Sequence, residues 1–331
     1  MMEAVGAHIF AGGFTIGVRR AGFDARVHLE DGTYGAEIAT KNLGVKTHTD
    51  RASWPSVSGV PFVYANPPCV GWSAANKAPG KQAQRAGLEA AKGVTFGLRD
   101  LLGQGPTVLA TESVPGVRRE FPRFQSWARD FGYNLYLVKV DTSLLGAPQR
   151  RLRYFVVWSR VALDFPKPSM PVVTVRDAWG DIQHDDVYNQ MPENTRKAWN
   201  LWKDSGSPPV RGLHHWGERL GVPVPFLAYV AGLDYPAPTF ICADRMYHPL
   251  EPRTLNVAES KAICAYPQNF DIHLDRKPSV SHTRYLGRSV LPPAGEWLAE
   301  RVRAGLEAQK GISEPATYLV DVVKGTVQKW L

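Results

Sequence analysis

Short runs of β-branched and aromatic residues alternate with helix-forming stretches from residue 1 to about residue 160. Such alternation is typical of a parallel sheet whose strands are joined by crossover helices. The pattern predicts strands at 5–10, 26–30, 61–65, 107–111, 134–140 and 153–158, and helices at 15–21 and 82–102. Because open α/β sheets bind ligands at the carboxyl ends of their strands, we expect the chemistry there.

The alternation stops between about residues 185 and 233, where segments such as SGSPPVRGLHHWGERLGVPVP show little regular periodicity. This interval is predicted to be a small, loop-rich region. Two more helices are predicted after it, at 255–265 and 293–308, the second with proline at its start. The tail at 317–331 is apolar and basic by turns, and the pattern assigns it no role.

Composition and charge narrow the class of protein. With 331 residues, 44% of them hydrophobic, the chain can bury a full core. No apolar stretch approaches the length of about 18 residues that spans a membrane, and the N-terminus lacks a signal-peptide pattern, so no membrane partner is expected. The net charge of +8 suits a polyanionic partner, because Lys and Arg bound to phosphates release counterions.

The cysteines are few and irregularly spaced. Cys69, Cys242 and Cys264 have no CxxC or histidine spacing, which argues against a metal site and against a disulfide framework. A reducing cytoplasm is therefore the expected compartment. Cys69 differs from the others because it lies in NPPCVGWS, residues 66–73, directly after a predicted strand. It could be a small buried thiol in a turn, but this proline-stiffened loop favours a nucleophile.

Two further polar groups follow predicted strands. Glu112, in TESVPGV, could alone be a solvated loop carboxylate, but near a nucleophile it can donate a proton or stabilise charge. Arg151 and Arg153, in GAPQRRLRYFVV, are predicted to share a strand face because side chains alternate along a strand. Alone they could be a solvated edge, whereas beside a reactive site they can hold a carbonyl, a carboxylate or a phosphate. The combination is far more specific than any single element.

Between about residues 5 and 303, apart from the loop-rich middle, the chain resembles the cytosine-C5-specific DNA methyltransferase family in the order and spacing of nearly all its motifs. NPPCVGWS, TESVPGV and QRRLR resemble the catalytic cysteine loop, the Glu-Asn-Val motif, with Ser113 in place of Asn, and the Gln-x-Arg-x-Arg motif. FAGGFTIGVRRAGF and EDGTYGAEIATKN resemble the cofactor loop and the ribose-binding strand end. VTVRDAWGDI, EPRTLNVAESKAICAYPQNF and YLGRSVLPP resemble the segment before target recognition and the two closing motifs.

The resemblance implies an α/β, Rossmann-like, S-adenosylmethionine-dependent methyltransferase fold, with a mixed, mostly parallel sheet and helices on both faces. It implies a cofactor-binding and catalytic domain at 1–184, a small loop-rich target-recognition region at 185–233, and closing motifs at 234–331 that return to the catalytic domain. The implied partner is double-stranded DNA, in a restriction-modification or similar DNA-modification role. We expect a monomer in the cytoplasm, associated with the nucleoid in a bacterial or viral host.

The resemblance also implies a role for individual residues. Cys69 would add to C6 of a flipped-out cytosine, because C5 is not nucleophilic enough to take a methyl group directly. Glu112 would contact the base at N3 and N4, supported by Arg151 and Arg153. Glu30 would bind the ribose hydroxyls and Asp50 the adenine. The remaining implied contacts are to the cofactor for Phe10, Ala11, Gly12, Gly13, Asp31, Pro68, Arg288 and Ser289, and to DNA for Ser73, Gln149 and Arg253.

The sequence departs from the family at two cofactor motifs. The glycine loop is about two residues shorter, and His8 and Ile9 stand where an acidic residue commonly opens it. Arg288 replaces the Asn of Gly-Asn-Ser-Val. A guanidinium beside the cofactor's sulfonium would be repelled by several kcal/mol in a dry pocket. Either Arg288 turns outward to a phosphate or to solvent, or it pairs with a carboxylate on the transferred group, as in carboxy-S-adenosylmethionine, which would give 5-carboxymethylcytosine.

Three other functions are distinguishable. An amino-methyltransferase also uses a Pro-Pro loop, but it carries an aromatic residue in place of Cys69 and needs neither Glu112 nor QRRLR. Methylation of RNA, including tRNA, at cytosine C5 stays open, because the same fold and Pro-Cys loop can act on it. A catalytically silent DNA-binding relative would have no need for the intact set of Cys69, Glu112, Arg151 and Arg153.

Overall fold

The computed structural model describes residues 1–30, 35–69, 72, 97–180, 182, 188–208, 212–241, 245–272 and 281–330. The chain forms two compact units. The sheet unit comprises Met1–Asp141, Leu152–Ser169 and Pro292–Leu331, and the helical unit comprises Thr142–Arg151 and Met170–Leu291. The helical unit thus extends beyond the predicted region at 185–233 on both sides. None of the helices that the structure describes is long and apolar enough to cross a membrane.

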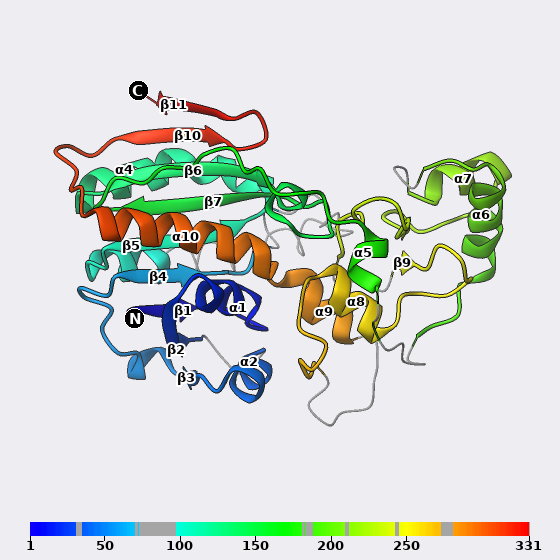
Figure 1. The fold of residues 1–331 in the computed structure, drawn as a ribbon, viewed down its shortest axis with the longest axis horizontal. Coiled ribbons are helices and arrows are strands. Elements are labelled where there is room, and N and C mark those ends of the chain that lie inside the picture. Colours follow the sequence, from blue (N-terminus) through cyan, green and yellow to red (C-terminus); the bar gives the residue numbers. More distant parts are fainter. Residues whose placement is uncertain are drawn as a thin grey trace, which may run out of the picture. The chain divides into compact units, whose positions relative to one another are not determined.

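The sheet unit is built on one sheet, whose order in the described residues is β11-β10-β6-β7-β5-β4-β1-β2-β3 (Figure 1). All six predicted strands are present: β1 (Met2–Ala7), β2 (Phe23–Leu29), β4 (Phe62–Ala65), β5 (Val108–Ser113), β6 (Asn134–Asp141) and β7 (Leu152–Ser159). The other strands are β3 (Lys46–His48), β10 (Thr317–Asp321) and β11 (Thr326–Trp330). β7 is antiparallel to β5 and β6, and β10 to β11, whereas the other pairs are parallel. The predicted mixed, mostly parallel sheet is confirmed.

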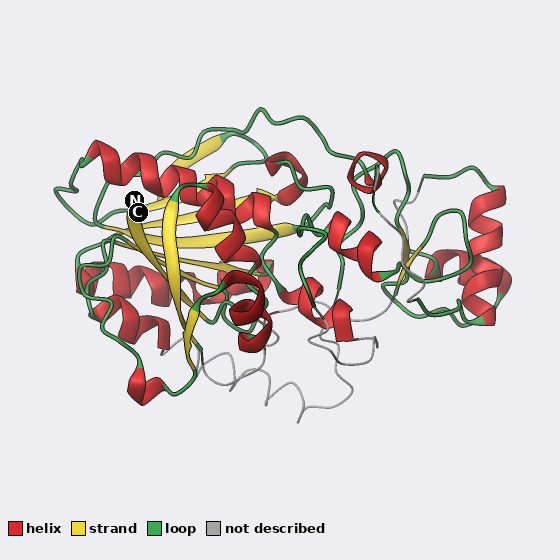
Figure 2. Cartoon of the chain, turned by 60° about the horizontal axis from the view of Figure 1, so that its bottom comes forward, coloured by secondary structure: helices red, strands yellow, loops and turns green. Residues whose placement is uncertain are grey.

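Helices cover both faces of this sheet (Figures 1 and 2). They include α1 (Gly13–Arg20), α2 (Ala36–Leu43), α4 (Phe121–Phe131) and α10 (Pro292–Ala308). Val63 and Ala65 of β4 belong to the same core cluster as Phe124 of α4. Tyr64, between them in sequence, points to the other face and lies 5.1 Å, ring to ring, from Phe14 of α1. Because both faces are covered, every residue of β4 is buried.

The first and last helices of the unit pack unusually closely. A Cβ atom on Gly17 of α1 would lie 2.4 Å from both the carbonyl oxygen of Pro292 and the amide nitrogen of Glu296. No real side chain tolerates such contacts, so glycine is required for this approach. The packing fixes α10, which follows the second closing motif, against the helix that follows the glycine loop.

The C-terminal tail forms the hairpin β10–β11 and extends the sheet at β6. The Tyr318 ring stacks on that of Tyr136 with centroids 5.0 Å apart, and Lys139 forms an ion pair with Asp321 at 2.9 Å. The sequence pattern had assigned this tail no role. β10 is partly buried beside β6, whereas β11 at the edge of the sheet is largely exposed.

The helical unit contains α5 (Val175–Trp179), α6 (Glu193–Asp204), α7 (His214–Leu220), α8 (Val257–Ile263) and α9 (Ser281–Arg288), with a short pair of strands, β8 (Tyr229–Val230) and β9 (Met246–Tyr247). The prediction of a loop-rich region at 185–233 is only partly right. α6 and α7 bury Trp199, Trp202 and Trp216 in a small core of their own. The helices are short, so neither gives a long periodic pattern.

A chain of buried polar groups lies between β2, α1 and β4. His28 Nε2 is 2.8 Å from Thr15 Oγ1, which in turn is 2.9 Å from the Tyr64 hydroxyl. Burial, together with the nearby Arg19, lowers the pKa of His28 to about 3. Burial also raises the pKa of Tyr64. Both side chains are therefore neutral in the folded protein near pH 7.

We expect His28→Gln to flatten the acid side of the stability profile. An unfolded chain protonates this histidine near its ordinary pKa of 6.5, whereas the folded protein does not until about pH 3. Stability is therefore retained above pH 6.5 and lost as the pH falls through this window, by up to about 1.4 kcal/mol per pH unit. Urea unfolding at a series of pH values measures the slope for both proteins, and parallel profiles would contradict the prediction.

Candidate functional site

The loop after β4 presents the candidate nucleophile. Asn66 and Pro67 are buried, Pro68 is exposed and Cys69 is half-buried. The Asn66 amide donates to the carbonyl oxygen of Ala7 at 3.2 Å, which fixes the start of the loop to β1. The two prolines restrict the backbone that follows. Cys69 therefore lies in a rigid loop at the carboxyl end of a strand, as the sequence predicted.

The loop after β5 packs directly against the cysteine loop. Glu112 is the next-to-last residue of β5, and a short 3₁₀ helix, η3 (Pro115–Glu120), follows. A Cβ atom on Gly116 would lie 2.0 Å from the carbonyl oxygen of Trp72, so only glycine permits this approach. The segment after Cys69 and the segment after Glu112 are thereby held in contact.

Glu112 is almost fully buried, and a different donor binds each of its carboxylate oxygens. Arg153 Nε lies 2.8 Å from Oε1, and Asn66 Nδ2 donates to Oε2 at 3.1 Å. The register explains the second contact, because Ala65 of β4 lies opposite Thr111 of β5, so the next residues are Asn66 and Glu112. A buried carboxylate without such donors would be costly to keep ionised. Glu112 and Arg153 are thus brought together as predicted.

The two described cysteines differ in environment. Cys264 is wholly buried, and burial raises the pKa of its thiol to about 12. Gln149 Nε2 lies 3.6 Å from its sulfur. Cys69 is partly exposed, and a thiolate must be reachable to act as a nucleophile. The third cysteine, Cys242, lies outside the described residues.

Arg151 has a different partner from Arg153. Arg151 is buried and directly precedes β7, which begins at Leu152, whereas Arg153 lies within the strand. Its Nη2 donates to the carbonyl oxygen of Gly287 at 2.8 Å, within the helical unit. This bond holds the end of α9, next to Ser289. A contact of Arg151 with a base stays a prediction.

Gln149 has an internal role in place of the predicted DNA contact. Its side chain is fully buried in the helical unit. Nε2 donates to the carbonyl oxygen of Ile263 at 3.3 Å, and Oε1 accepts from the amide of Phe240 at 3.1 Å. Sequence patterns could not reveal this, because its partners lie about ninety or more positions away in the chain.

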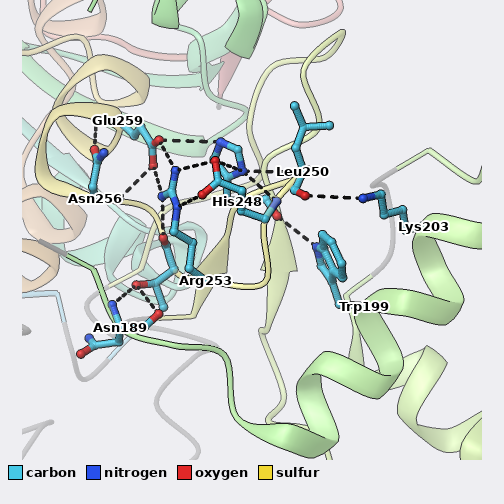
Figure 3. A network of polar contacts seen from close by, with 10 residues as sticks. Asn189, Trp199, Lys203, His248, Leu250, Arg253, Asn256 and Glu259 are labelled. Atoms are coloured by element: carbon cyan, nitrogen blue, oxygen red, sulfur yellow. Dashed lines mark hydrogen bonds and ion pairs between the residues drawn. The ribbon is translucent and has the colours of Figure 1, made fainter. Parts of the chain in front are cut away.

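Arg253 is also internal rather than exposed to a phosphate (Figure 3). Nη1 and Nη2 each donate to one oxygen of Glu259, both at 2.8 Å, and Nε donates to Glu251 at 2.8 Å. Burial works against the charge, but the bonds from Glu259 and Glu251 outweigh it and raise the pKa of Arg253. The same bonds hold the pKa of Glu259 below its ordinary value although burial opposes this.

The network around Arg253 connects separate elements of the helical unit. Glu259 also accepts from the amide of Asn256 at 2.9 Å, which caps α8. His248 Nε2 lies 3.7 Å from Glu259. Trp199 of α6 donates through Nε1 to the carbonyl oxygen of His248 at 3.0 Å. The turn that carries Arg253 therefore ties α6 to α8 (Figure 3).

A second set of predicted residues lies at the carboxyl ends of β1 and β2. Glu30 is buried, and its Oε1 accepts from the amides of Ile9 at 2.6 Å and Phe10 at 3.1 Å. Phe10 and Gly12 have left-handed backbones, with φ of 62° and 86°. No side chain caps the start of α1, and its first turn carries no acidic residue. A buried carboxylate for a sugar diol, beside a glycine turn that leads into α1, is a set of groups that fits S-adenosylmethionine.

The other predicted cofactor residues are placed as follows. Ala11, Gly12 and Gly13 are buried in the turn before α1. Asp50 is exposed, and its Oδ1 accepts from the amide of Ala52 at 3.0 Å, at the start of a short 3₁₀ helix, η1 (Arg51–Ser53). Ser289 is buried and accepts from the Tyr266 hydroxyl, whereas Arg288 beside it is exposed. Asp31 and Ser73 lie outside the described residues.

Asn66 is the contact residue that sequence reasoning missed. It was included in the cysteine loop but given no role. Its signal was available, since it is a donor side chain at the carboxyl end of the strand before the one that carries Glu112. What could not be known was the register that puts Asn66 and Glu112 side by side.

The described residues contain no group of three or more His, Cys, Asp or Glu side chains that could hold a metal ion.

Comparisons with known proteins identify the family of the chain. The family model for C-5 cytosine-specific DNA methylase matches residues 9–304. A type II methyltransferase, M.MthTI of Methanothermobacter thermautotrophicus, is 33% identical over 187 residues, which are 52% of this chain and 54% of that protein. M.MspI of Moraxella sp is 24% identical over 225 residues, 65% of this chain and 50% of that protein. The chain thus spans about half the length of these curated relatives.

Solved structures show the same fold. The Entamoeba histolytica methyltransferase EhMeth aligns with a TM-score of 0.70 at 14% identity, over 92% of this chain and 99% of that one. A prophage-encoded putative DNA modification methyltransferase from E. coli aligns with a TM-score of 0.62 at 17% identity, over 93% and 100%. At these identities the likeness concerns the fold, and it covers the sheet and helical units alike.

The Arg253 network leads to a stability prediction. Arg253→Met leaves the buried Glu259 carboxylate without its partner, which costs about 3 to 5 kcal/mol of unfolding free energy. Arg176, whose ion pair with Asp234 is exposed on both sides, is the matched control. Arg176→Met is expected to cost at most about 1 kcal/mol. Denaturant unfolding measures both, and equal, small losses would mean that Arg253 is free for another role.

Proposed function

Because the chain belongs to the C-5 cytosine-specific DNA methylase family, we propose that it transfers a methyl group from S-adenosylmethionine to C5 of cytosine in double-stranded DNA. The observation that carries the proposal is the pairing of two loops, one with the half-buried Cys69 and one with a carboxylate held by Asn66 and Arg153. Gly116 keeps these loops in contact. This is a nucleophile beside an acid, which is the arrangement that cytosine C5 chemistry needs.

Cys69 supplies the nucleophile. Its thiolate forms a bond to C6 of the cytosine, and the ring electrons move to make C5 carbanion-like. S-adenosylmethionine, when bound, supplies the electrophilic methyl group that C5 takes. A base then removes the proton from C5, and the bond between sulfur and C6 breaks as Cys69 leaves. The products are 5-methylcytosine, S-adenosylhomocysteine and one proton.

Glu112 is proposed to act on the base rather than on the cysteine. A carboxyl group at N3 of cytosine donates a proton there as C6 is attacked, and its other oxygen accepts from the N4 amino group. Arg153 fixes the position of one carboxylate oxygen from β7. Glu30 is proposed to hold the ribose of the cofactor, and Ser289 of the second closing motif to contact the cofactor. Arg151 is proposed to support the contact between Glu112 and the base.

Target recognition is assigned to the part of the helical unit around α6 and α7. Their common core positions exposed basic side chains, among them Arg196 and Lys203 of α6 and Arg219 of α7. A buried cytosine edge is out of reach in a duplex, so the base must be flipped out. RNA is the alternative substrate, because the same flipped base and the same positive charge serve either polymer.

A covalent trap tests the proposal and its alternatives together. Duplex DNA, duplex RNA and tRNA containing 5-fluorocytosine are incubated with the protein and S-adenosylmethionine. Fluorine at C5 cannot leave as a proton does, so an active enzyme stays bonded to the base through its cysteine. A stable adduct with DNA supports the proposal, an adduct with RNA alone supports the RNA enzyme, and no adduct with either supports a silent DNA-binding relative.

We expect Cys69→Ser to abolish both methyl transfer and adduct formation while binding of DNA and cofactor is retained, because the change removes only the nucleophilicity of the thiolate. Cys264→Ala is the control for loss of a cysteine, since the buried Cys264 is expected to have no part in transfer. Radiolabelled methyl transfer and gel-shift assays give the two readouts. Turnover by Cys69→Ser would rule out this nucleophile.

Recognition is predicted to be short. The region predicted to read bases has only about fifty residues, at 185–233, and so small a module brings few side chains to base edges. We expect a site of roughly two to four base pairs, with each bidentate contact giving about 1 to 3 kcal/mol of discrimination. Bisulfite sequencing of DNA from cells that express the protein reads the site directly. A strict site of about six bases would contradict this expectation.

Arg288 is the residue whose substitution distinguishes S-adenosylmethionine from carboxy-S-adenosylmethionine as the cofactor. Its exposure is compatible with an outward position at a phosphate, and also with a pocket that a carboxylated cofactor would complete. If it binds the carboxylate of carboxy-S-adenosylmethionine, Arg288→Asn shifts the preference toward S-adenosylmethionine by roughly ten- to a hundredfold, the worth of one charge-assisted bond. Nucleoside mass spectrometry after reaction with equal amounts of both cofactors gives the ratio of 5-carboxymethylcytosine to 5-methylcytosine. Unchanged ratios leave Arg288 outside the cofactor pocket.

A further inference from the structure

Two side chains, those of Arg153 and Asn66, bind the carboxylate of Glu112, and Asn66 has so far been given no role in the reaction. Arg153 contacts Oε1 from one side, and Asn66 donates to Oε2 from the other. Because the two donors use different oxygens, they fix the rotation of the carboxylate plane as well as its position. A carboxyl group that must face N3 and N4 of a base needs both.

Both the backbone and the side chain of Asn66 are fixed by their surroundings. Its backbone amide is bonded to Ala7, and Pro67 restricts it to an extended backbone. Its side chain is only 7% exposed, next to Glu112 at 3%. A buried amide keeps its orientation, because turning Nδ2 away would leave both Asn66 and Glu112 without this bond.

The chemistry of an amide suits this position better than a charged donor would. Glu112 is proposed to give up a proton and recover it in each cycle. Arg153 already places one positive charge beside Oε1, and a second cation at Oε2 would add to it. A neutral amide orients the oxygen and adds no charge.

We propose that Asn66 is a positioning residue for cytosine C5 transfer, which orients Glu112 toward the base by donating a hydrogen bond to Oε2. The inference rests on the proposed function and deepens it. It predicts a loss in the step that forms the bond between Cys69 and C6, with no loss in binding of S-adenosylmethionine.

The test compares Asn66→Ala and Asn66→Asp with the wild type in single-turnover formation of the 5-fluorocytosine adduct on duplex DNA. Loss of a hydrogen bond to a charged group predicts that Asn66→Ala forms the adduct roughly ten- to a hundredfold more slowly. Asn134→Ala is the matched control, because Asn134 is an equally buried amide in the sheet unit, at the start of β6, bonded to Ala316 and Tyr136. It is expected to lower thermal stability without slowing adduct formation.

The aspartate variant separates donation from packing. Asp has nearly the shape of Asn but accepts where Asn donates, so it repels Glu112. Donation predicts that Asn66→Asp is slower than Asn66→Ala near pH 8, whereas a space-filling role predicts the reverse. At lower pH a protonated Asp can donate, so the rate relative to wild type should rise as the pH falls. The titratable group that faces it is Glu112 of β5, whose other carboxylate oxygen is paired with Arg153 of β7.

The outcomes separate the inference from the function on which it rests. If the wild type traps no adduct with DNA, the proposed function falls, and the inference falls with it. If the wild type traps the adduct and Asn66→Ala keeps its rate, the function stands and the inference is overturned. A faster Asn66→Asp than Asn66→Ala also overturns it. The expected order, wild type above Asn66→Ala above Asn66→Asp with cofactor affinity unchanged, supports it.

Discussion

The register of β4, β5 and β7 controls where Asn66, Glu112 and Arg153 lie. A slip of one residue would exchange the two faces of a strand, and helices packed on both sides of the sheet make that slip costly. With Ala65 opposite Thr111, the next pair is Asn66 and Glu112, and with Glu112 opposite Phe155, Arg153 comes within reach from the other side. The packing of apolar residues on the sheet therefore sets the distances between the polar groups of the site. The proposed chemistry depends on that packing.

Two buried glutamates are each paired with an arginine, but the two pairs are suited to different roles. Glu259 is fully satisfied within the helical unit, because Arg253 binds both of its oxygens and the Asn256 amide adds a third bond. Such a group is suited to holding elements together. Glu112 has a single donor for each oxygen and lies beside the loop of a half-exposed cysteine. A carboxylate with fewer donors keeps lone pairs that can accept from a base, which suits it to the proposed contact with cytosine.

Much of the fold and part of the site could be predicted from the sequence. The six strands of the first half were found because two-sided burial leaves short, continuous runs of β-branched and aromatic residues. α1 and α10 were found because their apolar residues recur at helical spacing next to recognisable strands or helix starts. α6 and α7 were not, since glycine and proline lie close to their ends and their three tryptophans bury in a small core of their own rather than against the sheet. The hairpin β10–β11 was missed because its partner, β6, lies far back in the chain.

By itself, the sequence determined which residue types stand at the carboxyl ends of the strands, because strand patterns and loop motifs each involve only a few neighbouring positions. That was enough to single out Cys69, Glu112 and Arg153. Only the tertiary structure decided which polar groups face one another. It turned Gln149 and Arg253 inward to partners in other segments, sent Arg151 to Gly287, and gave Asn66 a contact with Glu112. The physical reason is that a hydrogen bond depends on distance in space, and buried donors take whichever acceptors the packing of apolar faces brings within about 3 Å.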